Sequence, residues 1–253
     1  MLSRLLREFL FLLVHLVVNV LVAVQNVYHG FWAKRYSLRR CEVTRSEICL
    51  LMKHAPSLSK RPQHMVVLAD TEHHCMSDLA RVVIWSLVAG VPYISFHDVT
   101  GQLKQNEEKL FLEVERHKKG VPGYIKWANK PDLNGYTNGI QAHTVIINIF
   151  NSKDGRPKIA ECISQIAEER SKSMRNTEIT VKELNTRLSS LYPSIPDPDV
   201  IFYTGASCCS HGVLPWQIRL AEFVQLSLDH SINVNTYVGA LYKYNKCDQR
   251  FGK

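Results

Sequence analysis

The sequence predicts an α/β domain with a mostly parallel central sheet flanked by helices, and an N-terminal transmembrane helix before it. Short runs rich in Val and Ile, such as residues 143–150, are typical of strands buried on both faces. These runs alternate with longer amphipathic stretches, which is the pattern of a parallel sheet with crossover helices. A separate apolar stretch near the N-terminus is long enough to cross a bilayer.

Length and charge limit the class of protein. The 253 residues accommodate one domain of roughly 190 to 210 residues and an appendage. The net charge is +8, but residues 1–40 carry most of it. The sequence has no nucleic-acid-binding motif and no basic stripe interleaved with aromatic residues. We therefore expect no nucleic acid among the partners.

The N-terminal segment from Phe9 to Val24 is apolar except for His15 and Asn19. With its apolar margins it reaches about the 20 residues that span a bilayer. A basic start would also suit a cleaved signal peptide, but no small-x-small cleavage site precedes Tyr28. We expect residues 1–30 to be a retained membrane anchor, with cleavage as the alternative.

Charges around this segment predict its orientation. The basic residues after it are Lys34, Arg35, Arg39 and Arg40, against Arg4 and Arg7 before it. Aromatic residues also follow it, as at a membrane interface. The positive-inside rule therefore favours a domain that faces the cytosol.

Residues 31–63 are predicted to be a juxtamembrane connector, because Pro56, Ser57, Ser59 and Pro62 interrupt a polar stretch. The domain is expected to cover residues 64–253. Strands are expected at 64–70, 92–97, 143–150, 200–203 and 222–226. Helices are expected at 78–89, 104–118, 156–171, 181–191 and 235–246.

Local signals define some of the element ends. Ser77 or Asp78 suits the N-cap of the first helix of the domain, and Gly90 suits its C-terminal stop. Residues 120–142 hold four Gly, two Pro and three Asn, which predicts a long loop or a short hairpin. The strand at 200–203 ends in Thr-Gly, and open α/β sheets usually bind ligands at such carboxyl ends.

Three C-terminal motifs resemble one enzyme family. They are Asp197-Pro198-Asp199, Leu214-Pro215-Trp216-Gln217-Ile218-Arg219-Leu220-Ala221-Glu222 and Arg250-Phe251-Gly252. The sequence resembles the cis-prenyltransferases, which build polyprenyl diphosphates from isopentenyl diphosphate. It is more similar to their non-catalytic partners, the Nogo-B receptor type subunits of dehydrodolichyl diphosphate synthase. The resemblance runs from about His64 to the C-terminus and, more loosely, includes the membrane segment.

Catalytic members of this family carry an Asp-Gly-Asn-Arg-Arg-Trp loop after the first strand. Here Asp70 falls on the catalytic aspartate, but Thr71, Glu72, His73 and His74 follow it. The glycine and both arginines that would cradle a diphosphate are therefore absent. We interpret Asp70 as a relic.

A second catalytic cluster of the family has the form Arg-Thr-Ser/Gly-Gly-Glu-x-Arg-x-Ser-Asn. Tyr203 and Cys209 stand at its arginine positions, Ser207 at the glutamate and His211 at the serine. Tyr carries no charge at pH 7 and cannot replace Arg in binding a diphosphate. Glu222 falls on the family's metal-binding carboxylate, and we interpret it as a structural remnant.

Other candidate metal or redox residues have ordinary explanations. His73, His74 and Cys75 suggest a metal site, but adjacent histidines in a polar loop are usually solvated. Cys208 and Cys209 are interpreted as loop thiols. The seven cysteines include no Cys-x-x-Cys, which argues against a disulfide framework and a zinc site and fits a reducing compartment.

Two C-terminal features point to a partner subunit. The resemblance implies that Arg250 and Gly252 cross a dimer interface and help to hold isopentenyl diphosphate in the partner's site; a solvated tail is the alternative. The expected dimer surface is the apolar series Leu214, Trp216, Ile218, Leu220, Phe223 and Val224. These residues could instead fill the domain's own core.

The resemblance implies an accessory subunit of a heteromeric dehydrodolichyl diphosphate synthase at the endoplasmic reticulum membrane. The complex would elongate farnesyl diphosphate with isopentenyl diphosphate for dolichol synthesis and protein N-glycosylation, with Mg²⁺ in the catalytic cis-prenyltransferase subunit. Membrane lipid is a further expected partner. The alternatives are a self-sufficient cis-prenyltransferase homodimer and a non-enzymatic membrane receptor or scaffold.

Overall fold

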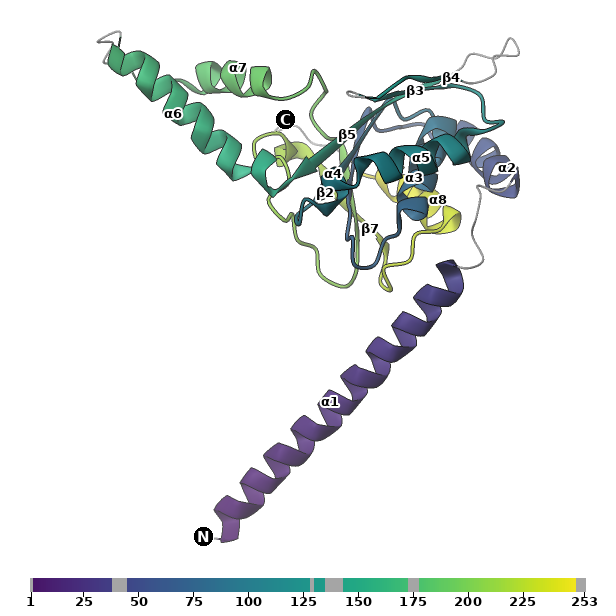
Figure 1. The fold of residues 1–253 in the computed structure, drawn as a ribbon, viewed down its shortest axis with the longest axis vertical. Helices are drawn as coiled ribbons and strands as arrows, with labels where there is room; N and C mark the ends of the chain where they lie inside the picture. The colour runs from purple at the N-terminus through teal and green to yellow at the C-terminus, as the bar shows by residue number, and fades with distance from the viewer. Residues whose placement is uncertain (1, 38–44, 128–129, 135–142, 173–177, 249–253) are drawn as a thin grey trace. The chain divides into compact units, whose positions relative to one another are not determined.

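The computed structural model describes the chain except for residues 1, 38–44, 128–129, 135–142, 173–177 and 249–253. The chain forms two compact units, Met1–Cys41 and Glu42–Lys253, which are described separately. The first unit contains the helix α1, Leu2–Ser37 (Figure 1). Its window Arg7–Val24 has a mean hydropathy of 2.0 and is long and apolar enough to cross a membrane.

The second unit is built on one mostly parallel sheet. Within the described residues its strand order is β4-β3-β5-β2-β1-β6-β7, and only the β3–β4 pair is antiparallel. This confirms the predicted fold class, and the region 120–142 contributes the short hairpin. The strands are β1 His64–Leu68, β2 Tyr93–Asp98, β3 Tyr124–Trp127, β4 Leu133–Asn134, β5 Thr144–Asn151, β6 Val200–Thr204 and β7 Glu222–Ser227.

The helices of the second unit follow the predicted order, with α2 added and one predicted helix divided in two. They are α2 Arg45–His54, α3 Met76–Ala89, α4 Gln102–Gln105, α5 Glu107–Lys118, α6 Arg156–Lys172, α7 Val181–Leu191 and α8 Val234–Asn245. Short 3₁₀ turns occur at Ala55–Ser57, Ser152–Asp154 and Ile218–Leu220.

Two predicted helix boundaries were wrong. The N-cap of α3 is Cys75 rather than Ser77 or Asp78, and Asn106 divides the predicted helix 104–118 into α4 and α5. Gly90 does end α3, in the left-handed conformation with φ 76° that glycine adopts without strain.

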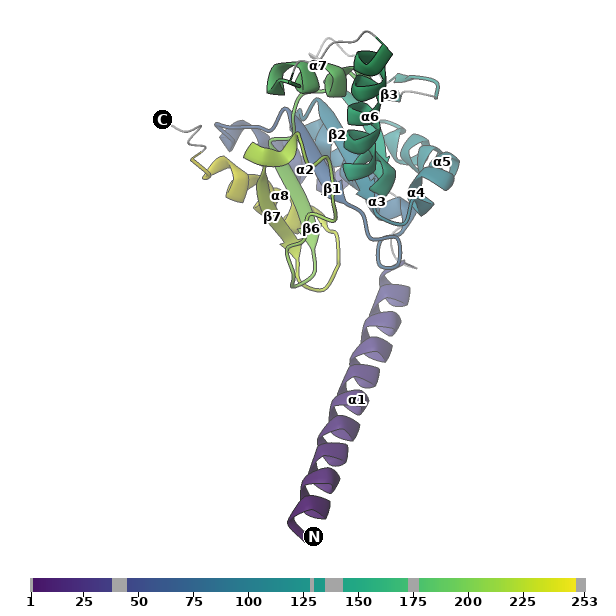
Figure 2. The same cartoon turned by 90° about the vertical axis from the view of Figure 1, so that its left-hand side faces the viewer.

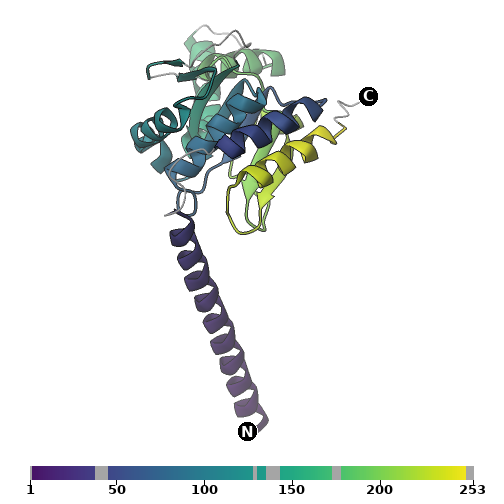
Figure 3. The same cartoon turned by 90° about the vertical axis from the view of Figure 1, so that its right-hand side faces the viewer.

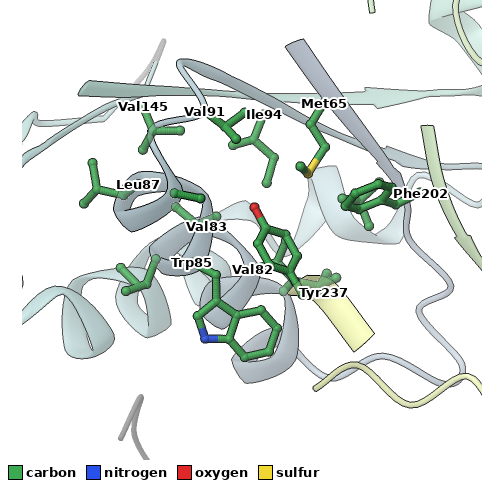
Figure 4. Packing of buried hydrophobic residues seen from close by; sticks show 14 of the residues in the cluster. Met65, Val82, Val83, Trp85, Leu87, Val91, Ile94, Val145, Phe202 and Tyr237 are labelled. Carbon is green, nitrogen blue, oxygen red and sulfur yellow. The ribbon is translucent and has the colours of Figure 1, made fainter. Parts of the chain in front are cut away.

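Alternate residues of the central strands face two separate hydrophobic cores. Met65 and Val67 of β1 face the larger core, together with residues of α2, α3, α5 and α8. Figure 4 shows Trp85 of α3 and Tyr237 of α8 lying together in this core, and their ring centroids are 5.5 Å apart. Figure 3 shows α2 and α8 side by side.

The smaller core lies on the opposite face of the sheet. Val66 and Leu68 of β1 pack there against Cys162 and Ile166 of α6 and Leu188 of α7. Figure 2 shows α6 and α7 lying apart from α8. The sheet is therefore covered on both faces, as a parallel sheet requires.

The helix α2 lies within the stretch that the sequence analysis assigned to a connector. Leu51 is buried in the larger core. The Glu47 carboxylate accepts hydrogen bonds from the Arg81 guanidinium and from Trp85 Nε1. These contacts tie α2 to α3, so its helical state depends on tertiary packing.

Candidate functional site

A cavity of about 490 Å³ opens at the carboxyl ends of β1, β2 and β6. The chain leaves β1 toward β2 on one side, and β6 flanks β1 on the other, which makes this a topological switch point of the sheet. The lining comes from residues 68–71, 97–100 and 203–207, with Cys209, His211 and His230. The strand ends therefore bring the first predicted segment, around Asp70, together with the second, around Tyr203.

The cavity lining is acidic and rich in histidine. Asp70, Asp98 and three histidines belong to it, and among the described residues that line it none is Lys or Arg. Tyr203, Ser207, Cys209 and His211 all line the cavity, so the positions aligned with the family's catalytic cluster do face it. An anionic ligand would meet two carboxylates and no cationic side chain from the described lining.

Asp70 lies just beyond β1, with its side chain 38% exposed. Its Oδ1 accepts a hydrogen bond from the Glu72 amide at 3.0 Å, and its Oδ2 accepts one from His73 Nδ1 at 2.7 Å. Partial burial raises the pKa of Asp70, but these hydrogen bonds outweigh it and lower the pKa below the ordinary value. Asp70 is therefore a carboxylate at neutral pH.

His74 lies beneath the cavity and is only 4% exposed, so the expectation that it is a solvated loop histidine was wrong. Its Nδ1 accepts a hydrogen bond from the Asp70 amide at 3.0 Å, which leaves Nε2 to donate to Thr204 Oγ1 at 3.2 Å. Burial lowers the pKa of His74 to about 4, so the ring is neutral at pH 7. The ring ties the loop after β1 to the end of β6.

His73 and His230 stack on each other, with ring centroids 4.2 Å apart and planes 17° apart. His230 comes from the loop between β7 and α8, where its φ is 58°. Its Nδ1 is 3.1 Å from Thr204 Oγ1 and 3.9 Å from Asp70 Oδ2. Ligand atoms of Asp70, His73 and His230 all lie within 4.8 Å of one another.

The sequence analysis did not identify His230. No local signal marks this residue, because its role depends on contact between two loops that are far apart in the sequence. A side chain at Gly205 would place its Cβ 2.7 Å from the His230 ring, and Gly205 has a φ of +86°. Glycine at this position therefore gives the His230 ring its space beside β6.

Asp98 and His97 belong to the wall of the cavity. The Asp98 carboxylate accepts hydrogen bonds from the Thr100 amide, the Thr100 hydroxyl and the Leu103 amide, at 2.7 to 2.9 Å. It therefore shapes the loop after β2. His97 Nε2 donates to the His211 carbonyl at 3.2 Å, and burial lowers the pKa of His97.

Glu222 does not reach this cavity within its own chain. It is the first residue of β7 and pairs with Val200, the first residue of β6, whereas the cavity lies at the other end of these parallel strands. Its amide donates to the Asp199 carbonyl at 2.9 Å. The Asp199 carboxylate accepts from the amides of Gln63 and His64, so the Asp-Pro-Asp motif joins the starts of β1, β6 and β7.

The predicted dimer segment is used in two ways. Leu214 and Val224 are buried in the domain itself, as the alternative explanation held. Trp216, Ile218 and Phe223 are half-buried against the smaller core. Leu220 is 53% exposed. The segment leads into β7, the last strand of the sheet.

Two further sets of predicted residues are the C-terminal pair and the cysteines. Arg250 and Gly252 lie outside the described residues. The six described cysteines are all free, and Cys208 and Cys209 are exposed.

The fold is shared with a solved prenyl diphosphate synthase. Lavandulyl diphosphate synthase from Lavandula x intermedia, in complex with dimethylallyl diphosphate, matches 76% of this chain and 98% of its own, with a TM-score of 0.52 and 15% identity. Its likeness concerns the fold alone. The domain thus has a cis-prenyltransferase fold.

Sequence comparison is more specific, although no family model matches the chain. The dehydrodolichyl diphosphate synthase complex subunit NUS1 of Homo sapiens is 31% identical over 208 residues, which are 78% of this chain and 69% of that protein. The Mus musculus subunit is 30% identical over 206 residues, covering 78% and 68%. The Saccharomyces cerevisiae subunit is 25% identical over 204 residues. The chain belongs to the family of these NUS1 subunits.

Proposed function

We propose that this chain is the accessory subunit of a heteromeric dehydrodolichyl diphosphate synthase. In that role it supports cis-prenyl elongation of farnesyl diphosphate with isopentenyl diphosphate, for dolichol synthesis and protein N-glycosylation. Its relatives are named as subunits of such a complex. The observation that carries the accessory role is the cavity lining, which holds Asp70 and Asp98 but, among its described residues, no Lys or Arg.

Transfer to an allylic diphosphate requires that the negative charge of the leaving group be neutralised. Phosphate sites use Arg, Lys, helix N-termini or a metal ion for this purpose. Two like charges about 4 Å apart repel by about 4 kcal/mol at an effective dielectric constant of about 20. The Asp70 carboxylate therefore opposes binding of a diphosphate in this cavity.

The cavity also does not suit Mg²⁺, which prefers six oxygen ligands in octahedral geometry. Asp70 is half-exposed, but Asp98 uses both carboxylate oxygens to hold its own loop. Glu222 lies at the opposite end of the strands. We therefore assign Mg²⁺ to the catalytic partner.

The remaining part of this proposal concerns the partner. Arg250 and Gly252 extend into the partner's site, where the guanidinium fork matches the oxygens of isopentenyl diphosphate. Trp216, Ile218, Leu220 and Phe223 form the contact surface, since they keep exposed area. Leu214 and Val224 support this surface from the core.

The helix α1 anchors the complex at the endoplasmic reticulum membrane, with the domain on the cytosolic side. Its apolar window could span the bilayer by length and composition. The product has a long hydrocarbon chain that belongs in lipid, whereas the substrates are diphosphates in water. An anchored subunit therefore keeps synthesis at the surface into which the product passes.

Incorporation of labelled isopentenyl diphosphate into polyprenyl products tests the proposal. The full chain, the catalytic homologue from the same organism and the co-purified pair are assayed separately with farnesyl diphosphate. We expect synthesis only or mainly from the pair. Synthesis by this chain alone would establish the self-sufficient enzyme instead. No gain from the pair, with a competent catalytic subunit, would favour the receptor or scaffold.

A further inference from the structure

We propose that Asp70, His73 and His230 form a binding site for a borderline divalent transition-metal ion such as Zn²⁺. This site goes beyond the accessory role. A bound cation would offset the charge of Asp70, so the accessory role would then rest on the lack of a described Lys or Arg in the lining and on the synthesis assay. The test below measures metal binding alone, so its outcome can be told apart from that of the assay. The inference starts from the convergence of one carboxylate and two imidazoles at the cavity, contributed by two loops that are distant in sequence.

The spacing of the three side chains suits a single ion. Zinc binds imidazole nitrogen and carboxylate oxygen at about 2.0 to 2.2 Å, which places neighbouring ligands of a tetrahedral site roughly 3.3 Å apart. Asp70 Oδ2 is 2.7 Å from His73 Nδ1 and 3.9 Å from His230 Nδ1. An ion would take the place of the proton that Asp70 and His73 share. The His230 ring would have to turn out of its stack on His73, because a metal ion lies in the plane of each imidazole that binds it.

A second set of residues holds these ligands in position. Thr204 Oγ1 holds the His230 ring beside the cluster through Nδ1, a hydrogen bond that the ion would replace, and it also hydrogen-bonds to the buried ring of His74. His74 in turn accepts from the Asp70 amide, so one chain of hydrogen bonds connects both loops. Metal-binding histidines and carboxylates are commonly oriented by such outer partners. The Gly205 backbone provides the space for the His230 ring.

Charge and ligand type define the class of ion. The described cavity lining contains no Lys or Arg to repel a cation, and the Asp70 carboxylate supplies a negative charge. Two nitrogens and one oxygen suit Zn²⁺ and its first-row neighbours better than Mg²⁺, which prefers oxygen ligands. Because three protein ligands leave a position open, and because Asp70 and His230 line the cavity, water or another small ligand would complete the coordination from the cavity.

The test titrates Zn²⁺ into the full chain, stripped of metal, in competition with a chromogenic chelator. His73→Ala and His230→Asn remove one imidazole each. Asn is chosen at position 230 because it tolerates the left-handed backbone there. The matched control is His211→Asn, at another left-handed histidine of the same cavity that lies outside the cluster.

We expect one Zn²⁺ per chain, an affinity at least about tenfold lower in each imidazole variant, and no change in the control. His73 is 47% exposed, so His73→Ala keeps the test valid if His230→Asn does not fold. Equal binding by all variants would overturn the proposal, as would no binding by the unmodified chain.

Co²⁺ provides a second measurement, since its visible spectrum reports its ligands. Exposed Cys208 lies near the cavity, and Cys209 lines it, so thiolates are the rival ligands. A thiolate-to-cobalt charge-transfer band would assign the ion to these cysteines and overturn the proposal. A spectrum of nitrogen and oxygen ligation that is lost in His73→Ala would support it.

Discussion

The cavity at the carboxyl ends of the strands and the segment from Leu214 to Ser227 differ in how the chain uses their side chains. In the cavity, the backbone still brings Asp70 and Tyr203 to one place, but the lining offers no described cationic side chain to a diphosphate. In the segment, the side chains divide between the domain's own core and the surface. The comparison teaches that backbone position and side-chain chemistry are separate properties, since the strand ends bring these positions together whatever side chains they carry.

The tail gives the largest test of this comparison. Arg250→His should lower kcat/KM of the complex for isopentenyl diphosphate by about 10- to 100-fold, because a charge-assisted contact with its diphosphate is worth about 1.5 to 3 kcal/mol. A neutral imidazole cannot replace the guanidinium fork. The readout is kcat and KM for isopentenyl diphosphate, with Lys253→Ala as the control in the same tail. Full-rate synthesis by Arg250→His would remove the tail from the partner's site.

The next test separates the two uses of the segment. Leu214→Ala should lower the free energy of unfolding by about 2 to 5 kcal/mol, because Leu214 is 2% exposed in the smaller core. Leu220→Ala is the matched control, and its exposed side chain predicts a change within about 0.5 kcal/mol. Chemical denaturation of the full chain measures both values. A similar loss in both variants would contradict the division between core and surface.

Some elements of the fold could be predicted from the sequence, and others could not. The helix Val181–Leu191 was predicted with its observed bounds, and the structure shows that they are set locally. The Thr180 hydroxyl accepts a hydrogen bond from the Glu183 amide at its start, and Pro193 follows its end. The strand β1 was recognised because four of its five residues, Met65 to Leu68, form a continuous apolar run. In contrast, α2 depends on the bonds from Arg81 and Trp85 to Glu47, which the sequence does not reveal.

Prediction of the cavity from the sequence had the same limit. Its position followed from the rule for the carboxyl ends of parallel strands, and its Asp70 and Tyr203 walls followed from the motifs. His230 and the burial of His74 did not, since both depend on the approach of loops across the sheet. Local patterns thus predicted the elements and the edge that carries the cavity, but not which distant side chains meet there.

The third test uses pH to compare the two ends of the sheet. Burial lowers the pKa of His74, under the cavity, and of His64, at the start of β1, to about 4. The unfolded chain binds these protons near pH 6.5, so the stability is full above that pH and falls as the pH drops toward 4.

Each of these two histidines should lower the free energy of unfolding by about 2 kcal/mol when the pH falls from 7 to 5. Urea denaturation at both pH values measures the loss. His74→Gln and His64→Gln should each remove about half of it. A pH dependence unchanged in both variants would show that other groups govern acid stability.

The smallest expected effect concerns the cavity itself. Tyr203→Phe and Ser207→Ala alter two lining residues at positions aligned with an arginine and the glutamate of the catalytic cluster. If the cavity takes no part in the reaction, both variants should support synthesis within about twofold of the unmodified complex, a change of under 0.5 kcal/mol in the barrier. The measurement is the initial rate of the co-purified pair, with Arg250→His assayed beside them. If either variant lost nearly as much of the initial rate as Arg250→His, this cavity would take part in the reaction. Catalysis would then not be confined to the partner's site.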